Sequence, residues 1–250
     1  MNAMIFAAGL GTRLKPLTDS MPKALVPVAG KPLLRHVIDK IKVSGIHNIV
    51  VNVHHFAQQI IEYVDGEQGV LISDETDLLR DTGGALRHAA ALLRGDGGND
   101  YTLVHNVDIL SNTDLTAFCA NLDGVAARLL VSGRDTQRYL LFDDDMRLVG
   151  WTNVQTGEVK TPYEHLDPSR CRKLAFAGIH IISDKLIEEM QSLPERFPII
   201  DFYLSKCREH LIKGYIQPDL RLLDVGKVDT LASADTFLNT INHNSETCRK

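Results

Sequence analysis

Ala3-Met4-Ile5-Phe6-Ala7-Ala8-Gly9-Leu10-Gly11-Thr12-Arg13 is the segment that most clearly indicates the fold. Its first six residues form an apolar run typical of a buried strand, and two spaced glycines follow at once. Glycines allow the backbone to approach a phosphate closely and to turn its N–H groups inward. Arg13 adds a planar fork for phosphate oxygens, and Lys23, about ten residues further on, adds a mobile point charge. Together these residues predict a site able to hold a triphosphate.

Other glycine motifs do not fit this stretch. A dinucleotide-binding fingerprint requires a third glycine where Leu14 stands, and a P-loop requires a Gly-Lys-Ser/Thr sequence that is absent. The alternative interpretation is an ordinary strand and turn with surface charges. The continuation of the motif into Pro22-Lys23 favours the phosphate site over that alternative.

Short apolar runs alternate with amphipathic helical patterns through the first half of the chain. The predicted strands are 3–8, 48–53, 70–73 and 101–105, and the predicted helices are 33–44, 56–64, 81–94 (capped by Asp81 or Thr82) and one capped by Asn112 or Thr113. This rhythm predicts an α/β fold with a Rossmann-like, mixed and mostly parallel sheet flanked by helices. Such sheets bind ligands at the carboxyl ends of their strands, where residues 9–13 and Asp108 are expected.

The second half of the chain has a different pattern. It predicts strands at 125–132, 139–142, 148–151 and 174–182, a loop at 152–172, and helices at 184–191, at 200–211 and from 228 onward. No repeat or low-complexity linker separates the halves. We therefore expect a single domain over residues 1–241, with two halves at about 1–112 and about 113–241, and a polar tail at 242–250.

Bulk properties narrow the class of protein. The 250 residues suffice for one large domain, and the formal charge of −5 argues against a nucleic-acid partner. The four cysteines form no CxxC pair, which indicates reduced thiols and a cytoplasmic location. No apolar run in the sequence approaches the roughly 20 residues of a membrane span, so no membrane partner is expected.

Two further segments carry candidate site residues. Asp81-Thr82-Gly83-Gly84 predicts a helix start whose N–H groups are free to meet a ligand, although a plain helix entry also explains it. Asn106-Val107-Asp108 ends a buried strand. A carboxylate at that place suits a hard cation such as Mg²⁺, or it caps the following turn.

The N-terminal motif resembles that of the sugar-1-phosphate nucleotidyltransferases, which carry an A-A-G-x-G-T-R-L…P-K signature. The resemblance is strongest to short members such as mannose-1-phosphate guanylyltransferases and N-acetylmuramate-1-phosphate uridylyltransferases. It covers almost the whole chain, although only the N-terminal motif is highly specific. The resemblance implies a Rossmann-like fold of the nucleotide-diphospho-sugar transferase type, dependence on Mg²⁺ and release of pyrophosphate.

The same resemblance implies a nucleotide-binding half at about 1–112 and a sugar-binding half at about 113–241, and it implies roles for individual residues. The nucleotide-binding set is Ala8, Gly9, Gly11, Thr12, Arg13, Thr82, Gly83, Gly84 and Asn106. Within this set, Gly83 and Gly84 are implied to lie against the base. Arg13 and Lys23 are implied to be catalytic, with Lys23 holding phosphate near the reacting centre.

The resemblance also implies that Asp108 and Asp224 hold the metal ion together. The family usually has N-G-D, N-S-D or G-D around the first aspartate, so Val107 departs from its pattern. It commonly has D-x-G-T around the second, where this chain has Lys227 in place of the threonine. An aspartate before a glycine turn is common, but two carboxylates far apart in sequence can meet at one ion.

The sugar-binding residues are less sharply defined. Gly178 lies in Ala177-Gly178-Ile179, which resembles the family strand that lines the sugar pocket, and a bulge is the alternative explanation. Asp201 matches an acidic position of many members and otherwise serves as a helix cap. Arg138 follows a turn where relatives bind substrate, and Glu164 is a candidate from its place before the Gly178 strand.

The expected activity is transfer of a nucleoside monophosphate from an NTP to a sugar 1-phosphate, in nucleotide-sugar synthesis for a cell-envelope polysaccharide, by a monomer or homodimer. GTP with mannose, UTP with an N-acetylated sugar, and a manno-heptose phosphate all fit the sequence. One alternative is a phosphocholine cytidylyltransferase, which needs an aromatic and acidic cage for choline. Another is a non-catalytic sugar-nucleotide-binding regulator, which would be expected to lose Lys23 or a metal carboxylate.

Overall fold

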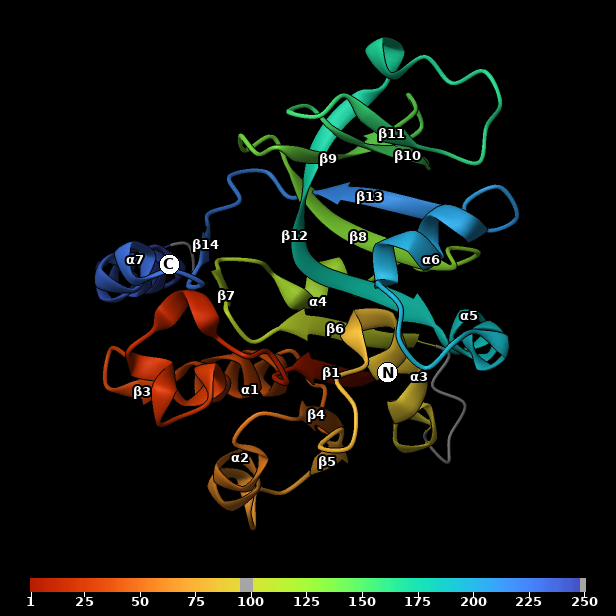
Figure 1. Cartoon of the computed structure of the whole chain (residues 1–250). Coiled ribbons are helices and arrows are strands. Elements are labelled where there is room, and N and C mark those ends of the chain that lie inside the picture. The colour runs from red at the N-terminus through yellow and green to blue at the C-terminus, as the bar shows by residue number, and fades with distance from the viewer. Residues whose placement is uncertain (95–100, 248–250) are drawn as a thin grey trace. The chain divides into compact units, whose positions relative to one another are not determined.

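The computed structural model describes residues 1–94 and 101–247, and its elements are shown in Figure 1. The chain forms two compact units built from interleaved segments. The first, here called the β1 unit, comprises Asn2–Leu79, Val104–Phe118 and Asp219–Lys250. The second, the β12 unit, comprises Arg80–Leu103 and Cys119–Pro218, together with Met1. The glycine turn, Lys23 and both candidate metal ligands thus belong to the β1 unit.

A parallel sheet forms the centre of the β1 unit. Strand β1 (Asn2–Phe6) pairs in parallel with β4 (Ile49–Val53), which pairs in parallel with β5 (Val70–Asp74). On the other side of β1 lies β6 (Tyr101–Asn106), whose last three residues belong to this unit. Strands β1 and β4 are buried almost throughout, which explains why they are continuous apolar runs without alternation.

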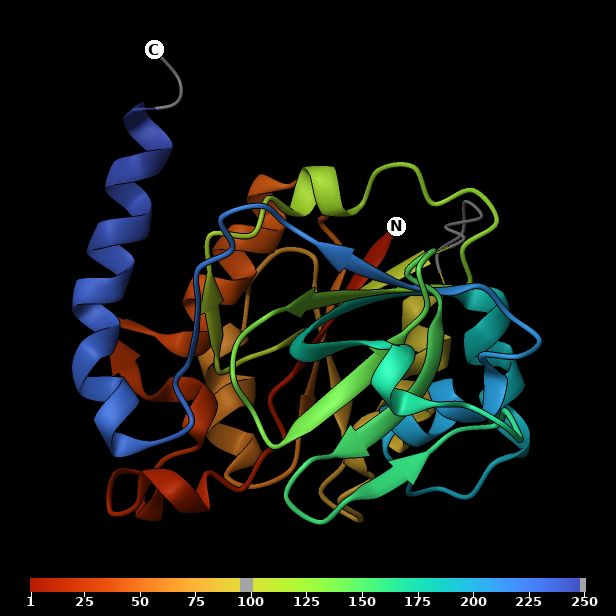
Figure 2. The same cartoon turned by 90° about the horizontal axis from the view of Figure 1, so that it is seen from above.

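Helices α1 (Leu33–Val43), α2 (Ala57–Val64), α4 (Leu115–Phe118) and α7 (Val228–Thr247) complete the β1 unit. The predicted apolar face of α1 is buried, and α2 packs on β4 and β5. In Figure 2, α7 runs beside the hairpin of β2 (Pro27–Val28) and β3 (Lys31–Pro32). There the Ala29 N–H donates to a carboxylate oxygen of Asp235 at 2.6 Å, which fixes the helix to the hairpin.

A second short ladder joins two distant parts of the chain within the β1 unit. Strand β7 (Ile109–Ser111) pairs antiparallel with β14 (Leu222–Asp224). The Asn112 side chain holds the far end of this ladder, since its oxygen accepts the Arg221 N–H at 2.8 Å and its amide donates to the Asp219 carbonyl at 3.0 Å. The sequence patterns did not predict this ladder.

Antiparallel pairing dominates the β12 unit. The strands are β8 (Ala127–Ser132), β9 (Arg138–Phe142), β10 (Leu148–Asn153), β11 (Glu158–Lys160), β12 (Arg172–Ser183) and β13 (Ile212–Ile216). The long strand β12 pairs antiparallel with both β8 and β9, whereas β13 pairs in parallel with β8. The helices are α3 (Asp81–Leu93), α5 (Asp184–Glu188) and α6 (Ile199–Lys206).

Three local predictions were wrong. The helix expected after Asn112 is only the single turn α4, and Asp114 caps it by accepting the Ala117 N–H at 3.0 Å. Asn112 is unavailable as a cap because its amide is engaged by residues 219 and 221. The expected loop 152–172 contains β11, and α7 continues to Thr247, into residues expected to form a tail.

The predicted fold class is confirmed. The central sheet is mixed, its purely parallel part belongs to the β1 unit, and helices flank it. Within the described residues, no helix combines the length and the apolarity needed to cross a membrane.

Candidate active site

Polar side chains hold the glycine turn after β1 through hydrogen bonds to its backbone. The Ala7 N–H donates to the buried Asn52 side chain at 2.7 Å, which fixes the point where the strand ends. Gly11 adopts a left-handed φ of 65°, and a Cβ placed on it would lie 2.8 Å from Thr18 Cγ2. The Thr18 hydroxyl donates to the Gly11 carbonyl at 2.8 Å. Only glycine therefore fits the position, and Gly9, Thr12 and Arg13 remain exposed on the outer side of the turn.

Lys23 lies directly behind this turn. The side chain is buried, with 8% of the residue exposed, and its Cβ would be 3.2 Å from a Cβ on Gly11. Its ammonium group forms an ion pair with Oδ2 of Asp108. Lys23 thus lies between the glycine turn and Asp108, the first candidate metal ligand, and contacts both.

The two candidate metal ligands lie at the same end of the short ladder between β7 and β14. Asp108 follows β6 and immediately precedes β7, and Asp224 ends β14 opposite Ile109. The Val225 N–H also donates to the Asp108 carbonyl at 2.8 Å. Among the described residues, Oδ1 of Asp224 is buried and has no hydrogen-bond partner.

Arg13 approaches the same place from the glycine turn. A Cβ placed on the buried Gly226 would lie 2.6 Å from Asp224 Oδ1 and 2.7 Å from Arg13 Nη2. The guanidinium and the carboxylate therefore both border the space beside Gly226, and no larger residue fits between them. Arg13 forms no ion pair within the described ranges, so its fork remains available for a ligand.

The residues present fit a divalent metal ion that is bound together with substrate. Mg²⁺ takes oxygen ligands, and in nucleotide sites one or two carboxylates hold it while phosphates complete the shell. Asp108 and Asp224 supply two carboxylates, and the unpartnered Asp224 Oδ1 is an oxygen with unused acceptor capacity. In the part of the chain that the structure describes, no group of three or more acidic, histidine or cysteine side chains could hold a metal by itself.

The strand before Asp108 explains one departure from the family motif. The Val107 N–H donates to the Phe6 carbonyl at 3.2 Å, and the side chain is buried at 5% exposure, so valine here fills space beside β1. Asn106 is half-buried. His105 is fully buried, as expected for a packed histidine, and burial lowers its pKa to about 4. The imidazole is therefore neutral at neutral pH.

Residues 82–84 belong to the β12 unit. The sequence predicted that their N–H groups would be free to meet a ligand, but the structure shows them hydrogen-bonded. Those of Gly83 and Gly84 donate to the Phe197 carbonyl at 2.9 and 3.2 Å. A Cβ on Gly83 would lie 2.2 Å from the Phe197 ring, so close packing explains this glycine. The capping prediction was also wrong: the N-cap is Arg80 without a side-chain cap bond, and the Thr82 hydroxyl instead accepts the Ile199 N–H at 2.9 Å.

The four candidate sugar-binding residues also belong to the β12 unit. Gly178 has a φ of 75° and lies where the pairing of β12 with β8 is irregular, as the bulge alternative predicted. Asp201 is exposed on α6, 3.3 Å from the Lys160 ammonium group. Glu164 lines a cavity of about 470 Å³ with Tyr163 and Arg208.

Arg138 begins β9 and is exposed. Among the described residues, no hydrogen bond or ion pair joins Arg138, Glu164 and Asp201 to one another. The structure therefore does not gather them into one cluster by direct polar contacts, and their roles in sugar binding stay predictions.

Sequence reasoning missed two residues that shape the turn. Thr18 and Asn52 contact its backbone directly, yet neither was a candidate. Asn52 carries a recognisable signal, because it is the polar residue in the otherwise apolar strand β4. A buried amide must find hydrogen-bond partners, and this one also donates to Glu75 at 2.8 Å.

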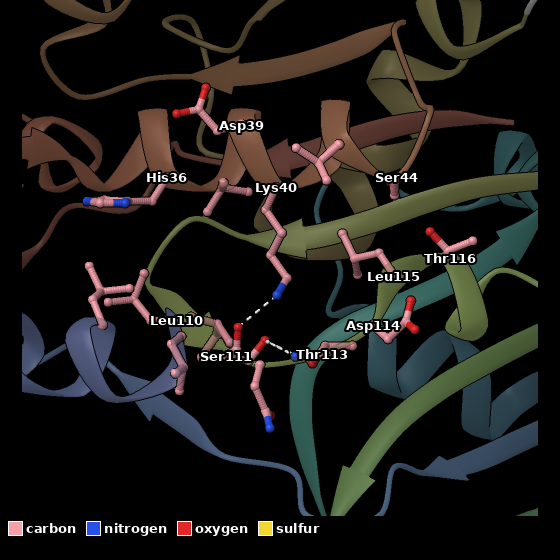
Figure 3. Close-up of a pocket in the computed structure, with 16 residues that line it drawn as sticks. His36, Asp39, Lys40, Ser44, Leu110, Ser111, Thr113, Asp114, Leu115 and Thr116 are labelled. Atoms are coloured by element: carbon pink, nitrogen blue, oxygen red, sulfur yellow. Dashed lines mark hydrogen bonds between the residues drawn. The ribbon is translucent and has the colours of Figure 1, made fainter. Parts of the chain in front are cut away.

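The β1 unit also contains a cavity of about 640 Å³ between α1, residues 109–116 and α7 (Figure 3). Lys40 extends from α1 across this space and donates to the Ser111 carbonyl at 2.7 Å. Burial lowers the pKa of Lys40 to about 8, and nearby Asp114 opposes the shift in part. The sequence patterns gave no sign of this cavity.

Comparison with known proteins identifies the family. The nucleotidyl transferase family model matches residues 2–139. N-acetylmuramate alpha-1-phosphate uridylyltransferase from Caulobacter vibrioides is 32% identical over 94% of this chain and 96% of its own. Mannose-1-phosphate guanylyltransferase from Mycobacterium tuberculosis is 34% identical over 46% of this chain and 32% of its own.

A solved structure shares the fold. HddC from Yersinia pseudotuberculosis, crystallised with GMP-PN, has a TM-score of 0.74 at 21% identity and covers 95% of this chain and 99% of its own. A family model thus matches more than half of the sequence, and a relative above 30% identity aligns over nearly the full length of both chains. The chain belongs to the sugar-1-phosphate nucleotidyltransferase family.

Proposed function

We propose that this protein transfers a nucleoside monophosphate from an NTP to a sugar 1-phosphate and releases pyrophosphate. The observation that supports the proposal is a set of two contacts: Lys23 behind the glycine turn pairs with Asp108, and Arg13 from the turn borders the same space beside Gly226 as Asp224. Two cations and two carboxylates at the end of a parallel sheet are the groups that phosphoryl chemistry requires.

The reaction forms a bond between the sugar phosphate oxygen and the α-phosphorus, and breaks the bond from the α-phosphorus to the bridging oxygen of the leaving pyrophosphate. The attacking oxygen arrives ionised, so no general base is needed. The main obstacle is repulsion between two anions: at 4 Å it amounts to about 4 kcal/mol per pair of unit charges at an effective dielectric constant of about 20. Catalysis then depends on positioning and on charge neutralisation.

Each cation has a distinct task in this proposal. Arg13, exposed on the turn, presents two N–H groups to the phosphates that leave as pyrophosphate. Lys23 projects from behind the turn and draws the sugar phosphate and the α-phosphate together. Asp108 and Asp224 would hold a Mg²⁺ ion, and the chemistry this ion supplies when bound is neutralisation of phosphate charge.

UTP and N-acetylmuramate 1-phosphate are the first substrates to test. The support is the uridylyltransferase relative, which aligns with this chain over nearly the full length of both. GTP and mannose 1-phosphate are the second pair, supported by a relative that aligns over about half of this chain. In either case the product would be a nucleotide sugar, as needed for a cell-envelope polysaccharide.

The test is a screen for pyrophosphate release with Mg²⁺, in which each NTP is paired with N-acetylmuramate, mannose, glucose and heptose 1-phosphates. We expect one pair to exceed the others by at least tenfold in kcat/KM. CTP with phosphocholine belongs in the same screen, since turnover there would support the cytidylyltransferase alternative. NTP binding without pyrophosphate release from any pair would support a regulator and refute the proposal.

Asp108→Asn tests the site itself. We expect pyrophosphate release to fall by at least about a hundredfold, because a neutral amide is a poor ligand for a hard cation. The matched control is Asp229→Asn, an exposed acidic residue at the start of α7 in the same unit, which should change the rate by less than twofold. A rate within twofold of wild type for Asp108→Asn would remove this residue from the mechanism.

A further inference from the structure

Lys23 and a divalent ion would compete for the same carboxylate. The Lys23 ammonium group is already paired with Asp108 Oδ2, and both side chains are largely buried, at 10% and 18% exposure. Removing one partner of a buried ion pair is strongly unfavourable, because the other charge is then left buried and uncompensated. An incoming cation therefore has to displace the lysine before it can use this oxygen.

The local charge provides little electrostatic attraction for a free cation to displace Lys23 from Asp108. Lys23 is paired with Asp108, and the Arg13 guanidinium borders the same space beside Gly226 as the Asp224 carboxylate, so two positive charges accompany two negative ones. The cluster is formally neutral, so it creates no strong field to attract an isolated dication. A nucleoside triphosphate changes this balance, because its phosphates attract both cations and bring oxygen ligands for the metal.

We propose that Lys23 blocks the metal-binding side of Asp108 until the nucleotide arrives, so that the divalent ion enters as its complex with the NTP and Lys23 turns from the carboxylate to the phosphates. The proposal rests on the proposed function only in assigning Asp108 as a metal ligand. Lys23 thus pairs first with Asp108 and then with the phosphates of the nucleotide. In this second position it can hold the α-phosphate.

The test measures binding of Mn²⁺ to the free protein, from the loss of the free-ion signal in electron paramagnetic resonance. We expect weak binding by wild type in the absence of nucleotide. Lys23→Met should bind Mn²⁺ at least about fivefold more tightly, which corresponds to about 1 kcal/mol of lost competition. The double variant Lys23→Met/Asp108→Asn should return to wild-type weakness or below, because the gained site uses Asp108.

Nucleotide should reduce the difference in Mn²⁺ affinity between the two proteins. With the non-cleavable α,β-methylene analogue of UTP, Mn²⁺ affinity should rise at least tenfold in wild type and by a smaller factor in Lys23→Met. The exposed Lys31→Met in the same unit is the control and should match wild type throughout. Lys23→Gln provides a second test if the methionine variant folds poorly, as judged by its circular dichroism and urea midpoint.

Equal Mn²⁺ affinity of folded Lys23 variants and wild type without nucleotide would overturn the inference, and so would tight Mn²⁺ binding by the free wild-type protein. These results do not depend on turnover. A protein that releases no pyrophosphate but gains Mn²⁺ affinity on loss of Lys23 would refute the proposed function and keep this inference. A protein that releases pyrophosphate but shows the same Mn²⁺ affinity with and without Lys23 would support the proposed function and refute this inference.

Discussion

Replacing Lys40 by methionine should stabilise the protein at neutral pH. Burial in the cavity wall lowers the Lys40 pKa from 10.5 to about 8 (Figure 3). At about 1.36 kcal/mol per pH unit, this corresponds to at most about 3 kcal/mol of folding free energy opposed to the charged amine. Methionine has a similar shape and carries no charge, but it loses the bond to the Ser111 carbonyl, worth about 1 kcal/mol. The expected net gain at pH 7 is roughly 1–2 kcal/mol.

The dependence on pH provides the more specific test. Below pH 8 the Lys40 amine is charged in both the folded and the unfolded protein, so the folded state bears the full cost. Between pH 8 and 10.5 the folded protein releases this proton while the unfolded chain retains it, and the stability of wild type therefore rises with pH relative to the variant. The advantage of Lys40→Met should shrink and disappear over this interval.

The assay is urea unfolding of both proteins at pH 7, 8, 9 and 10, followed by circular dichroism. The control is Lys185→Met, an exposed lysine that forms no ion pair among the described residues, and it should follow wild type at every pH. A Lys40→Met protein that is less stable than wild type at pH 7, by an amount that does not change up to pH 10, would refute the reasoning. It would mean that the bond to Ser111 outweighs the burial of the charge.

Two further predictions concern buried groups in the two units. His105→Leu should remove a loss of stability that occurs at acid pH. The pKa of His105 in the folded protein is about 4, below the ordinary 6.5, so wild type keeps its full stability above pH 6.5. As the pH falls to 4, wild type should lose up to about 3 kcal/mol more unfolding free energy than the variant, as measured by urea unfolding. Gly83→Ala should lower the unfolding free energy by about 1–3 kcal/mol, because its Cβ would lie 2.2 Å from Phe197. The control Gly133→Ala, whose Cβ would have nothing within 4 Å, should change it by less than about 0.5 kcal/mol. Equal urea midpoints for the two variants would contradict this prediction.

Local sequence patterns predicted those elements whose burial follows one period. The apolar run at 3–8, the one-sided helix at 33–44 and the strand at 48–53 match β1, α1 and β4 to within a few residues. The helix is indicated by apolar residues that recur on one helical face, and the strands by short apolar runs bounded by turn residues. The glycine turn was also predictable, because its residue types are needed for its own backbone conformation.

Elements that depend on distant partners were not predictable in this way. Strands β7 and β14 have three residues each, too few for a period, and they exist because each pairs with the other. The glycines of α3 were explained by ligand binding, whereas the structure shows that the Phe197 segment lies against them. A sequence gives the small size of such a residue but not the identity of what approaches it.

The metal site itself depends on this short ladder. Side chains alternate along a strand with a period of two, so a slip of one residue between β7 and β14 would turn Asp224 to the opposite side. Three paired residues hold register poorly unless their ends are fixed. Here the Val225 N–H bonded to the Asp108 carbonyl fixes one end, and the Asn112 side chain fixes the other. These contacts fix the register of the ladder and with it the side to which Asp224 points, so Asn112 helps to set the geometry of the candidate metal site through the backbone.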